Sequence, residues 1–166
     1  MKKRRTERIA QLGLLTALAL IASYIELLIP LPVGIPGVKL GLANLIIVWS
    51  VYTLKPMEAL AVNVMRILLA GFMFGNLSMI LYSLAGAGLS FLCMCLAKKS
   101  GAFSIIGVSV IGGITHNIGQ LAAAMLVLET ASLAYYGPVL LLSGLATGFL
   151  IGTVTEEVKK RTPFKP

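Results

Sequence analysis

Long apolar runs separated by short polar breaks constrain the fold of this chain more than any other feature of its sequence. Hydrophobic residues make up 58% of the 166 residues and charged residues only 12%, and the mean hydropathy is +0.95. A helix of about 20 apolar residues is long enough to cross the hydrocarbon core of a bilayer. Because backbone polar groups inside lipid must bond within their own segment, we expect each run to be a helix. The sequence therefore predicts an all-α integral membrane protein.

Six predicted spans account for most of the chain. They cover about residues 9–29, 38–54, 58–74, 77–97, 103–128 and 138–154. The breaks between them are too short for a soluble domain, so residues 1–166 are expected to form a single membrane domain, a six-helix bundle. The basic N-terminus followed by an apolar run resembles a secretory signal. That run is long and leads into further spans, so we interpret it as the first helix.

Lysine and arginine residues indicate how the predicted bundle is oriented. With both termini in the cytoplasm, all 14 basic residues except Lys39 and Arg66 lie on the cytoplasmic side. The positive-inside rule then predicts a multi-pass protein of the cell membrane with cytoplasmic N and C termini. Because topology and the lipid bilayer account for the net charge of +8, no nucleic-acid partner is expected.

Polar side chains inside the predicted spans mark a candidate ligand site. The candidates are Glu26, Lys39, Asn44, Asn63, Arg66, Asn76, His116, Asn117 and Gln120. On helices, Asn63 shares a face with Arg66, and His116 shares one with Gln120. Such groups are costly in hydrocarbon unless they meet each other, water or a ligand. Nearly all fall at or outside the membrane midplane, so we expect a cavity open to the exterior that binds a small, anionic ligand.

A purely structural interpretation of the same residues is also open. Arg66 then pairs with Glu26 or with backbone carbonyl groups, while the amides and His116 link neighbouring helices through hydrogen bonds. This interpretation corresponds to a membrane anchor or scaffold that has no ligand. It predicts a dry, tightly packed interior around Arg66 and His116.

Catalysis by this chain is not expected. The sequence contains no aspartate, and its six acidic residues are all glutamates. Enzymes that act on magnesium diphosphates hold the metal with clustered carboxylates. No nucleotide-binding loop and no metal-ligand spacing is present, so we expect no metal and no cofactor. Cys93 and Cys95, two residues apart on a helix, are interpreted as apolar packing residues.

Three separated motifs resemble a known membrane family. They are Pro36-Gly37-Val38-Lys39-Leu40-Gly41-Leu42-Ala43-Asn44, then Gly75-Asn76-Leu77-Ser78 with Tyr82-Ser83-Leu84-Ala85-Gly86, and Gly113-Ile114-Thr115-His116-Asn117-Ile118-Gly119-Gln120. The family is called heptaprenyl diphosphate synthase component I, or Gx transporters. It is in turn similar to the substrate-binding S components of energy-coupling factor (ECF) transporters, which are small six-helix membrane proteins.

The resemblance to S components implies partners as well as a fold. S components hold a vitamin-like ligand near the outer face and use their first helix to dock a transmembrane subunit driven by two ATPases. They typically carry two alanines four residues apart on that helix. Here the spacing is provided by Gly13 with Ala17 and by Ala19 with Ser23, which are the expected docking residues.

Two functions follow from the resemblance. The first is capture of a small vitamin-like, isoprenoid or quinone-related ligand from outside by a subunit of an ECF-type uptake transporter. The second is a non-catalytic accessory membrane subunit, component I, in heptaprenyl diphosphate synthesis or a quinone pathway. Ligand retained by the purified protein favours the first, and synthase activity of the purified chain would contradict a non-catalytic role.

Overall fold

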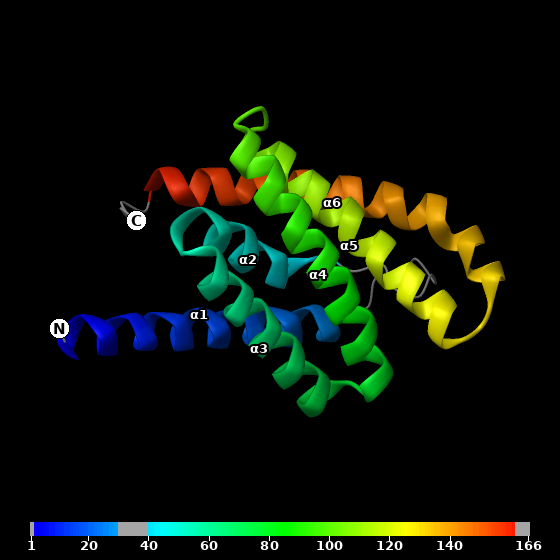
Figure 1. The fold of residues 1–166 in the computed structure, drawn as a ribbon, viewed down its shortest axis with the longest axis horizontal. Coiled ribbons are helices and arrows are strands. Elements are labelled where there is room, and N and C mark those ends of the chain that lie inside the picture. Colours follow the sequence, from blue (N-terminus) through cyan, green and yellow to red (C-terminus); the bar gives the residue numbers. More distant parts are fainter. Residues whose placement is uncertain (1, 30–39, 162–166) are drawn as a thin grey trace.

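The computed structural model describes residues 2–29 and 40–161, and the described part is entirely helical (Figure 1). Its elements are α1 (Lys2–Leu28), α2 (Leu42–Thr53), α3 (Pro56–Phe74), α4 (Leu77–Ser100), α5 (Ile105–Val127), the short 3₁₀ helix η1 (Ala131–Tyr136) and α6 (Gly137–Arg161). The first turns of α1 and the last turns of α6 lie at the same end of the molecule in Figure 1. We call this the terminal end.

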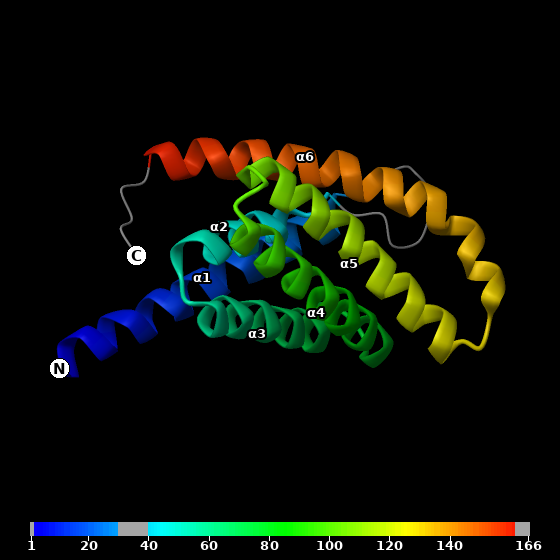
Figure 2. The same ribbon diagram turned by 45° about the horizontal axis from the view of Figure 1, so that its top comes forward.

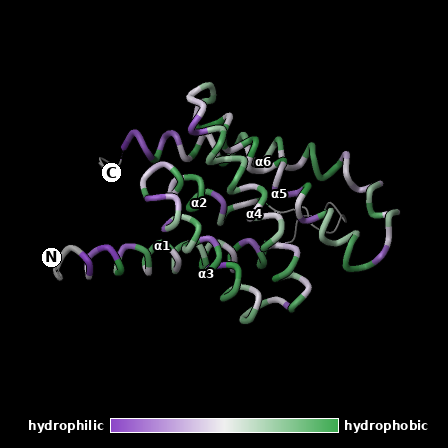
Figure 3. Tube along the Cα trace, viewed as in Figure 1, coloured by the Kyte–Doolittle hydropathy of each residue, from purple (hydrophilic) through white to green (hydrophobic). Residues whose placement is uncertain are grey.

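Five of the six α-helices are long and apolar enough to cross a membrane. Hydrophobic stretches run along them in Figure 3, and many large apolar side chains point outward, among them Leu14, Phe72, Leu142 and Phe149. A helix with apolar residues on its outward side fits a lipid surrounding. The chain is a multi-pass helical membrane protein. The count of six crossings and the cytoplasmic position of the termini stay predictions.

The second helix is shorter than predicted. It contains 12 residues instead of the run from 38 to 54, because it begins only after Gly41, whose φ of 77° lies outside the helical region. Residues 38 and 39 of the predicted span fall outside the described part of the chain. At 1.5 Å per residue, α2 extends only about 18 Å. It does not span a hydrocarbon core of about 30 Å by itself.

Other helix ends follow local chemistry. Asn76 and Ser104 cap α4 and α5, with side-chain oxygens that accept the amide hydrogens of Met79 and Gly107 at 2.8 and 3.2 Å. The C-terminal helix continues well past the predicted end at residue 154. Its last turns carry the pairs Glu156 with Lys160 and Glu157 with Arg161, which stabilise a solvated helix at a spacing of four.

The helices form two groups of three, α1 to α3 and α4 to α6 (Figures 1 and 2). Glycines bring the second group into close backbone contact. A Cβ atom added at Gly113 of α5 would lie 2.4 Å from the carbonyl oxygen of Gly144 in α6, and one at Gly119 would lie 2.8 Å from Cα of Gly86 in α4. Such small residues let membrane helices approach closely. The two groups meet where α3 contacts α4 and α2 contacts α6.

The main hydrophobic core lies toward the terminal end. It joins residues of all six helices: Leu15, Ile47, Val48, Trp49, Val51, Ala59, Val62, Phe91, Met94, Ala97, Val108 and Ile151. A smaller cluster of Ile67, Ile80 and Ala87 lies between α3 and α4. Tight packing is thus concentrated in one half of the bundle, and the other half contains a cavity.

Candidate functional site

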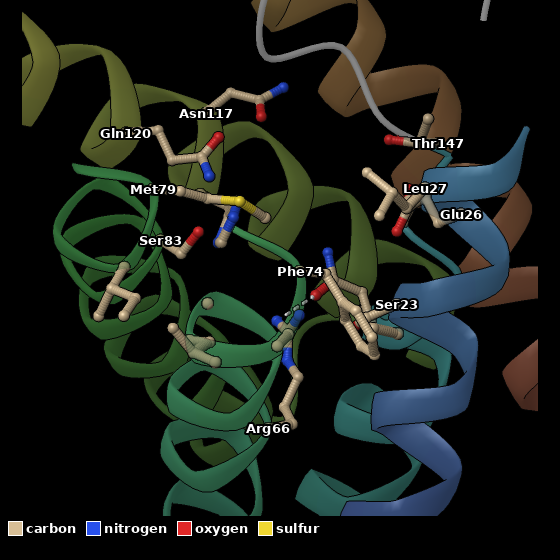
Figure 4. Close-up of a pocket in the computed structure, with 18 of the residues that line it drawn as sticks. Ser23, Glu26, Leu27, Arg66, Phe74, Met79, Ser83, Asn117, Gln120 and Thr147 are labelled. Atoms are coloured by element: carbon tan, nitrogen blue, oxygen red, sulfur yellow. Dashed lines mark hydrogen bonds between the residues drawn. The ribbon is translucent and has the colours of Figure 1, made fainter. Parts of the chain in front are cut away.

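A cavity of about 290 Å³ lies between the two groups of helices, and all six helices contribute to its wall. The last turns of α1 and α3 and the first turns of α2 and α4 line it, at the end of the bundle opposite the terminal end. Residues from the middle of α5 and α6 complete the wall. Figure 4 shows Arg66 extending into this space from α3, with Ser83 and Gln120 on the far side and Glu26 on α1. Six of the nine predicted site residues line it: Glu26, Asn44, Arg66, His116, Asn117 and Gln120.

Arg66 is held by two amide oxygens. Its Nε donates to Oδ1 of Asn63 at 3.1 Å, and its Nη2 donates to Oδ1 of Asn44 at 3.4 Å. A guanidinium has five N–H donors, so these two bonds leave several of them available. Within residues 2–29 and 40–161, no carboxylate lies within 4.0 Å of Arg66. The amides fix the position of the charge without neutralising it.

Glu26 has a different partner from the one considered in the structural interpretation. Its carboxylate accepts the backbone N–H of Gly41, which joins the end of α1 to the start of α2. The left-handed conformation of Gly41 strains any residue with a side chain at this turn. Glu26 therefore supplies negative charge to the wall of the cavity while it organises the backbone next to Asn44.

The polar face of α5 forms the opposite wall. Asn117 donates from Nδ2 to the carbonyl oxygen of Leu140 at 2.6 Å, so this amide also links α5 to α6. His116 and Gln120 lie against Gly86 of α4, where an added Cβ would come within 3.2 Å of both side chains. The glycine makes room for an imidazole and a carboxamide at the cavity. Together they offer a ligand both hydrogen-bond donors and acceptors.

The other three predicted site residues are not in the cavity wall. Asn63 is buried behind Arg66 and acts on the cavity through that side chain. Asn76 is exposed, caps α4 and does not line the cavity, because its side chain is turned to the backbone of its own helix. Lys39 lies outside the described residues.

The four predicted docking residues point in two directions. Gly13 and Ala17 are exposed on α1, and no atom lies within 4 Å of a Cβ built at Gly13. In contrast, Ala19 is completely buried and Ser23 lines the cavity. Only Gly13 and Ala17 are therefore positioned on a surface that another helix can reach.

Several lining residues were not assigned to the site by the sequence. They are Ser23, Phe74, Met79, Ser83 and Thr147, together with smaller apolar residues. The hydroxyl groups of Ser23 and Thr147 donate to carbonyl oxygens one turn earlier, at 2.9 and 2.8 Å, and leave their lone pairs free to accept. This bonding is possible on any helix face, so it provides no sequence signal. Phe74 packs against Tyr24 with ring centroids 4.9 Å apart.

The side chains around the cavity are suited to binding. Among the described residues, no three His, Cys, Asp or Glu side chains are grouped so that they could hold a metal ion. What the wall provides is one fixed guanidinium, one carboxylate, an imidazole, amides and hydroxyls beside apolar surface. This combination can recognise a small molecule with both polar and apolar parts.

The fold and cavity define a small helical membrane protein with an internal polar site. The family model of heptaprenyl diphosphate synthase component I matches residues 15–158, and the chain belongs to this family. The matched segment includes every residue that lines the cavity, and the name places the family in an assembly of more than one component. No curated protein and no solved structure matches the chain.

Proposed function

We propose that this protein captures a small ligand in its intramembrane cavity and acts as the substrate-binding, S-component-like subunit of an ECF-type uptake transporter. The ligand enters from the outer side, since the cavity lies away from the basic terminal end. Transport energy comes from partner ATPases, because the chain has no nucleotide-binding loop. The chain itself performs no catalysis.

The position of Arg66 carries this proposal. A guanidinium within a membrane helix is costly, and here Asn44 and Asn63 hold it toward a cavity. Glu26 in the same wall offsets this charge only in part, because its carboxylate accepts the N–H of Gly41 and lies more than 4.0 Å from the guanidinium. A carboxylate or phosphate on a ligand adds negative charge next to Arg66 and supplies acceptors for the remaining N–H groups. The scaffold interpretation, in contrast, requires a packed interior at this point.

The volume and lining limit the ligand further. A space of about 290 Å³ lies near the lower end of typical small-molecule sites. Leu27 and Phe74 provide apolar surface on one part of the wall, and Met79 lies with the polar groups of Gln120 and Ser83 on another (Figure 4). The ligand expected is small and amphipathic, with an acidic group directed to Arg66.

Ligand identification tests the proposal directly. The full chain is purified in mild detergent, and the small molecules that it retains are identified by mass spectrometry after denaturation. We expect one compound with an acidic group in the native protein, and a loss of at least about tenfold in Arg66→Met, since a charged hydrogen bond is worth about 1.5–3 kcal/mol. Arg8→Met is the matched control, because Arg8 pairs with Glu58 outside the cavity.

Two results would count against capture. One is a native protein that retains no compound and whose unfolding temperature is unchanged by any acidic metabolite in a screen. The other is retention that is equal in Arg66→Met and Arg8→Met.

The family assignment favours a second function, that of an accessory membrane component in prenyl diphosphate synthesis. The chain contains no aspartate for a magnesium diphosphate site, so its contribution is non-catalytic. This function predicts that a soluble synthase co-purifies with the chain. Adding the chain to that synthase should change the length of the prenyl product or the rate at which it forms. Co-purification of ATPase subunits instead supports uptake.

A further inference from the structure

A second cluster of polar groups lies at the terminal end, away from the cavity. Tyr52 is at the end of α2, and two lysines from other helices approach its ring. Nζ of Lys98 in α4 is 5.1 Å from the ring centroid, and Nζ of Lys159 in α6 is 4.6 Å from it. Three helices that are distant in sequence therefore place two ammonium groups around one phenol ring. We call these three residues the Tyr52 cluster.

Lys98 is fixed by a further contact. Its Nζ donates to the carbonyl oxygen of Val51 at 2.6 Å. Val51 belongs to the last turn of α2, where carbonyl groups lack partners within the helix. The lysine thus closes the end of this short helix and keeps its charge beside Tyr52. Two of its three N–H donors are not used by this bond.

The surrounding acidic groups do not neutralise the cluster. Glu156 and Glu157, on the same helix as Lys159, pair instead with Lys160 and Arg161. In the described ranges, no carboxylate lies within 4.0 Å of Lys98 or Lys159. Each ammonium group is stabilised by a cation–π interaction with the ring, but the two positive charges repel each other. An anion between them removes the repulsion and takes up the free donors.

The position of the cluster indicates which anion is available. Lys98 and Lys159 lie at the terminal ends of α4 and α6, two helices long and apolar enough to cross a membrane, and Tyr52 lies at the adjoining end of the short α2. The ends of such helices are expected at the level of the headgroups. Basic sites between such helices bind lipid phosphates, and tyrosine is favoured at this depth. Lys55 and Lys99, both exposed at the same end, add to the positive potential that attracts anionic lipids.

We propose that the Tyr52 cluster binds a phosphate group, with an anionic phospholipid headgroup as its source. The phosphate oxygens accept from Lys98 and Lys159, and the acyl chains lie along the apolar outer surface of the bundle. A bound lipid then joins α2, α4 and α6 at their terminal ends. This site is independent of the cavity and of the ligand proposed for it.

Thermal unfolding of the purified full chain in detergent tests the site. Phosphatidylglycerol is added in one arm, phosphatidylcholine in the second and inorganic phosphate in the third. We expect phosphatidylglycerol to raise the unfolding temperature of the native protein more than phosphatidylcholine does. In Lys98→Gln/Lys159→Gln its apparent affinity should fall about 30-fold, at roughly a factor of five per lysine. The control is Lys55→Gln/Lys99→Gln, which removes the same charge from the same end without touching Tyr52.

A single substitution separates binding from folding. Lys159→Gln leaves the bond between Lys98 and Val51 in place, so the protein should unfold as the native one does without lipid and still respond less to phosphatidylglycerol. If inorganic phosphate gives the stabilisation that the cluster variants lose, the site binds free phosphate. Equal lipid and phosphate responses in the cluster variants and in the control would overturn the proposal.

Discussion

The two halves of this bundle use the same helices for different purposes. At the terminal end, Ala59, Val62 and Val108 are at most 2% exposed, and the apolar side chains of all six helices meet. In the other half the same helices surround a space of about 290 Å³ with polar groups on its wall. The comparison shows that tight apolar packing and an open space with polar walls are separated along the axis of the bundle, so substitutions in the two halves should have different effects.

The separation has a physical origin in how the helix groups pack. Glycines bring the backbones of α4, α5 and α6 together along their lengths, from the contact of Gly86 with Gly119 to that of Gly152 with Ile106. The group of α1 to α3 lacks such pairs and meets the other group mainly through α3 with α4 and α2 with α6. The cavity lies between these two groups, where side chains instead of backbone contacts determine how far apart the helices are.

The largest difference between the halves is expected for two phenylalanines. Phe91→Ala opens a void in the terminal core and should lower the free energy of unfolding by about 4 kcal/mol. Phe74→Ala enlarges an existing cavity and loses one ring contact with Tyr24, so its cost should be about 1 kcal/mol. Equilibrium unfolding in mixed micelles measures both values. Equal costs would remove the distinction between the two halves.

The second-largest loss of stability is expected when a side chain is added at a glycine contact between helices. Gly113→Val pushes a side chain into the backbone of Gly144 and should destabilise the protein by about 3 kcal/mol. Gly88→Val on α4 is the matched control, since nothing lies within 4 Å of a Cβ there. The two unfolding temperatures should differ by several degrees. A Gly113→Val protein as stable as the Gly88→Val protein would show that α5 and α6 are not in backbone contact.

Substitution of a polar residue of the cavity should weaken ligand binding and leave stability nearly unchanged. Gln120→Leu removes a carboxamide that makes no side-chain hydrogen bond to another described residue, so the free energy of unfolding should stay within about 1 kcal/mol of native. Binding of the retained ligand should weaken about tenfold, because one hydrogen bond is lost. Paired measurements of unfolding and ligand retention check this. A large loss of stability would mean that Gln120 serves packing.

The smallest effect is expected at Asn76. Asn76→Ala removes the cap of α4 and should cost about 1 kcal/mol of stability. Ligand retention should not change, since the side chain does not line the cavity. Asn76→Ser, which retains a capping oxygen, should restore stability. If the Asn76→Ala protein is as stable as the native one but retains less ligand, Asn76 belongs to the binding site.

The sequence predicted the helices and the convergence of the membrane-depth polar groups, because a guanidinium or an imidazole inside an apolar run has few stable places. It did not predict the short α2, since the left-handed turn at Gly41 depends on the carboxylate of Glu26 from another helix. Asn76 was assigned to the rim of the site because its position in a short loop fits both a ligand contact and a helix cap.

The neighbours of small residues are the least predictable from the sequence. The spacing of Ala19 and Ser23 permits close helix contact, but spacing does not say which neighbour makes it, and both face the interior. Hydroxyls such as that of Thr147 bond to their own helix, so nothing in the sequence connects them with Arg66. Only the packing of all six helices determines which of these residues reach the cavity.

The shortness of α2 has an electrical consequence. The carboxyl end of α2 lies at the terminal end of the bundle, and a helix of about 18 Å reaches only partway across a bilayer, so its amino end lies at depth beside Asn44 and the cavity. The aligned peptide dipoles give that end a partial positive charge, and the low permittivity around it screens the field weakly. The amino end of α2 and Arg66 thus place positive potential on the same space, and the carboxylate of Glu26, which accepts the N–H of Gly41, occupies part of it.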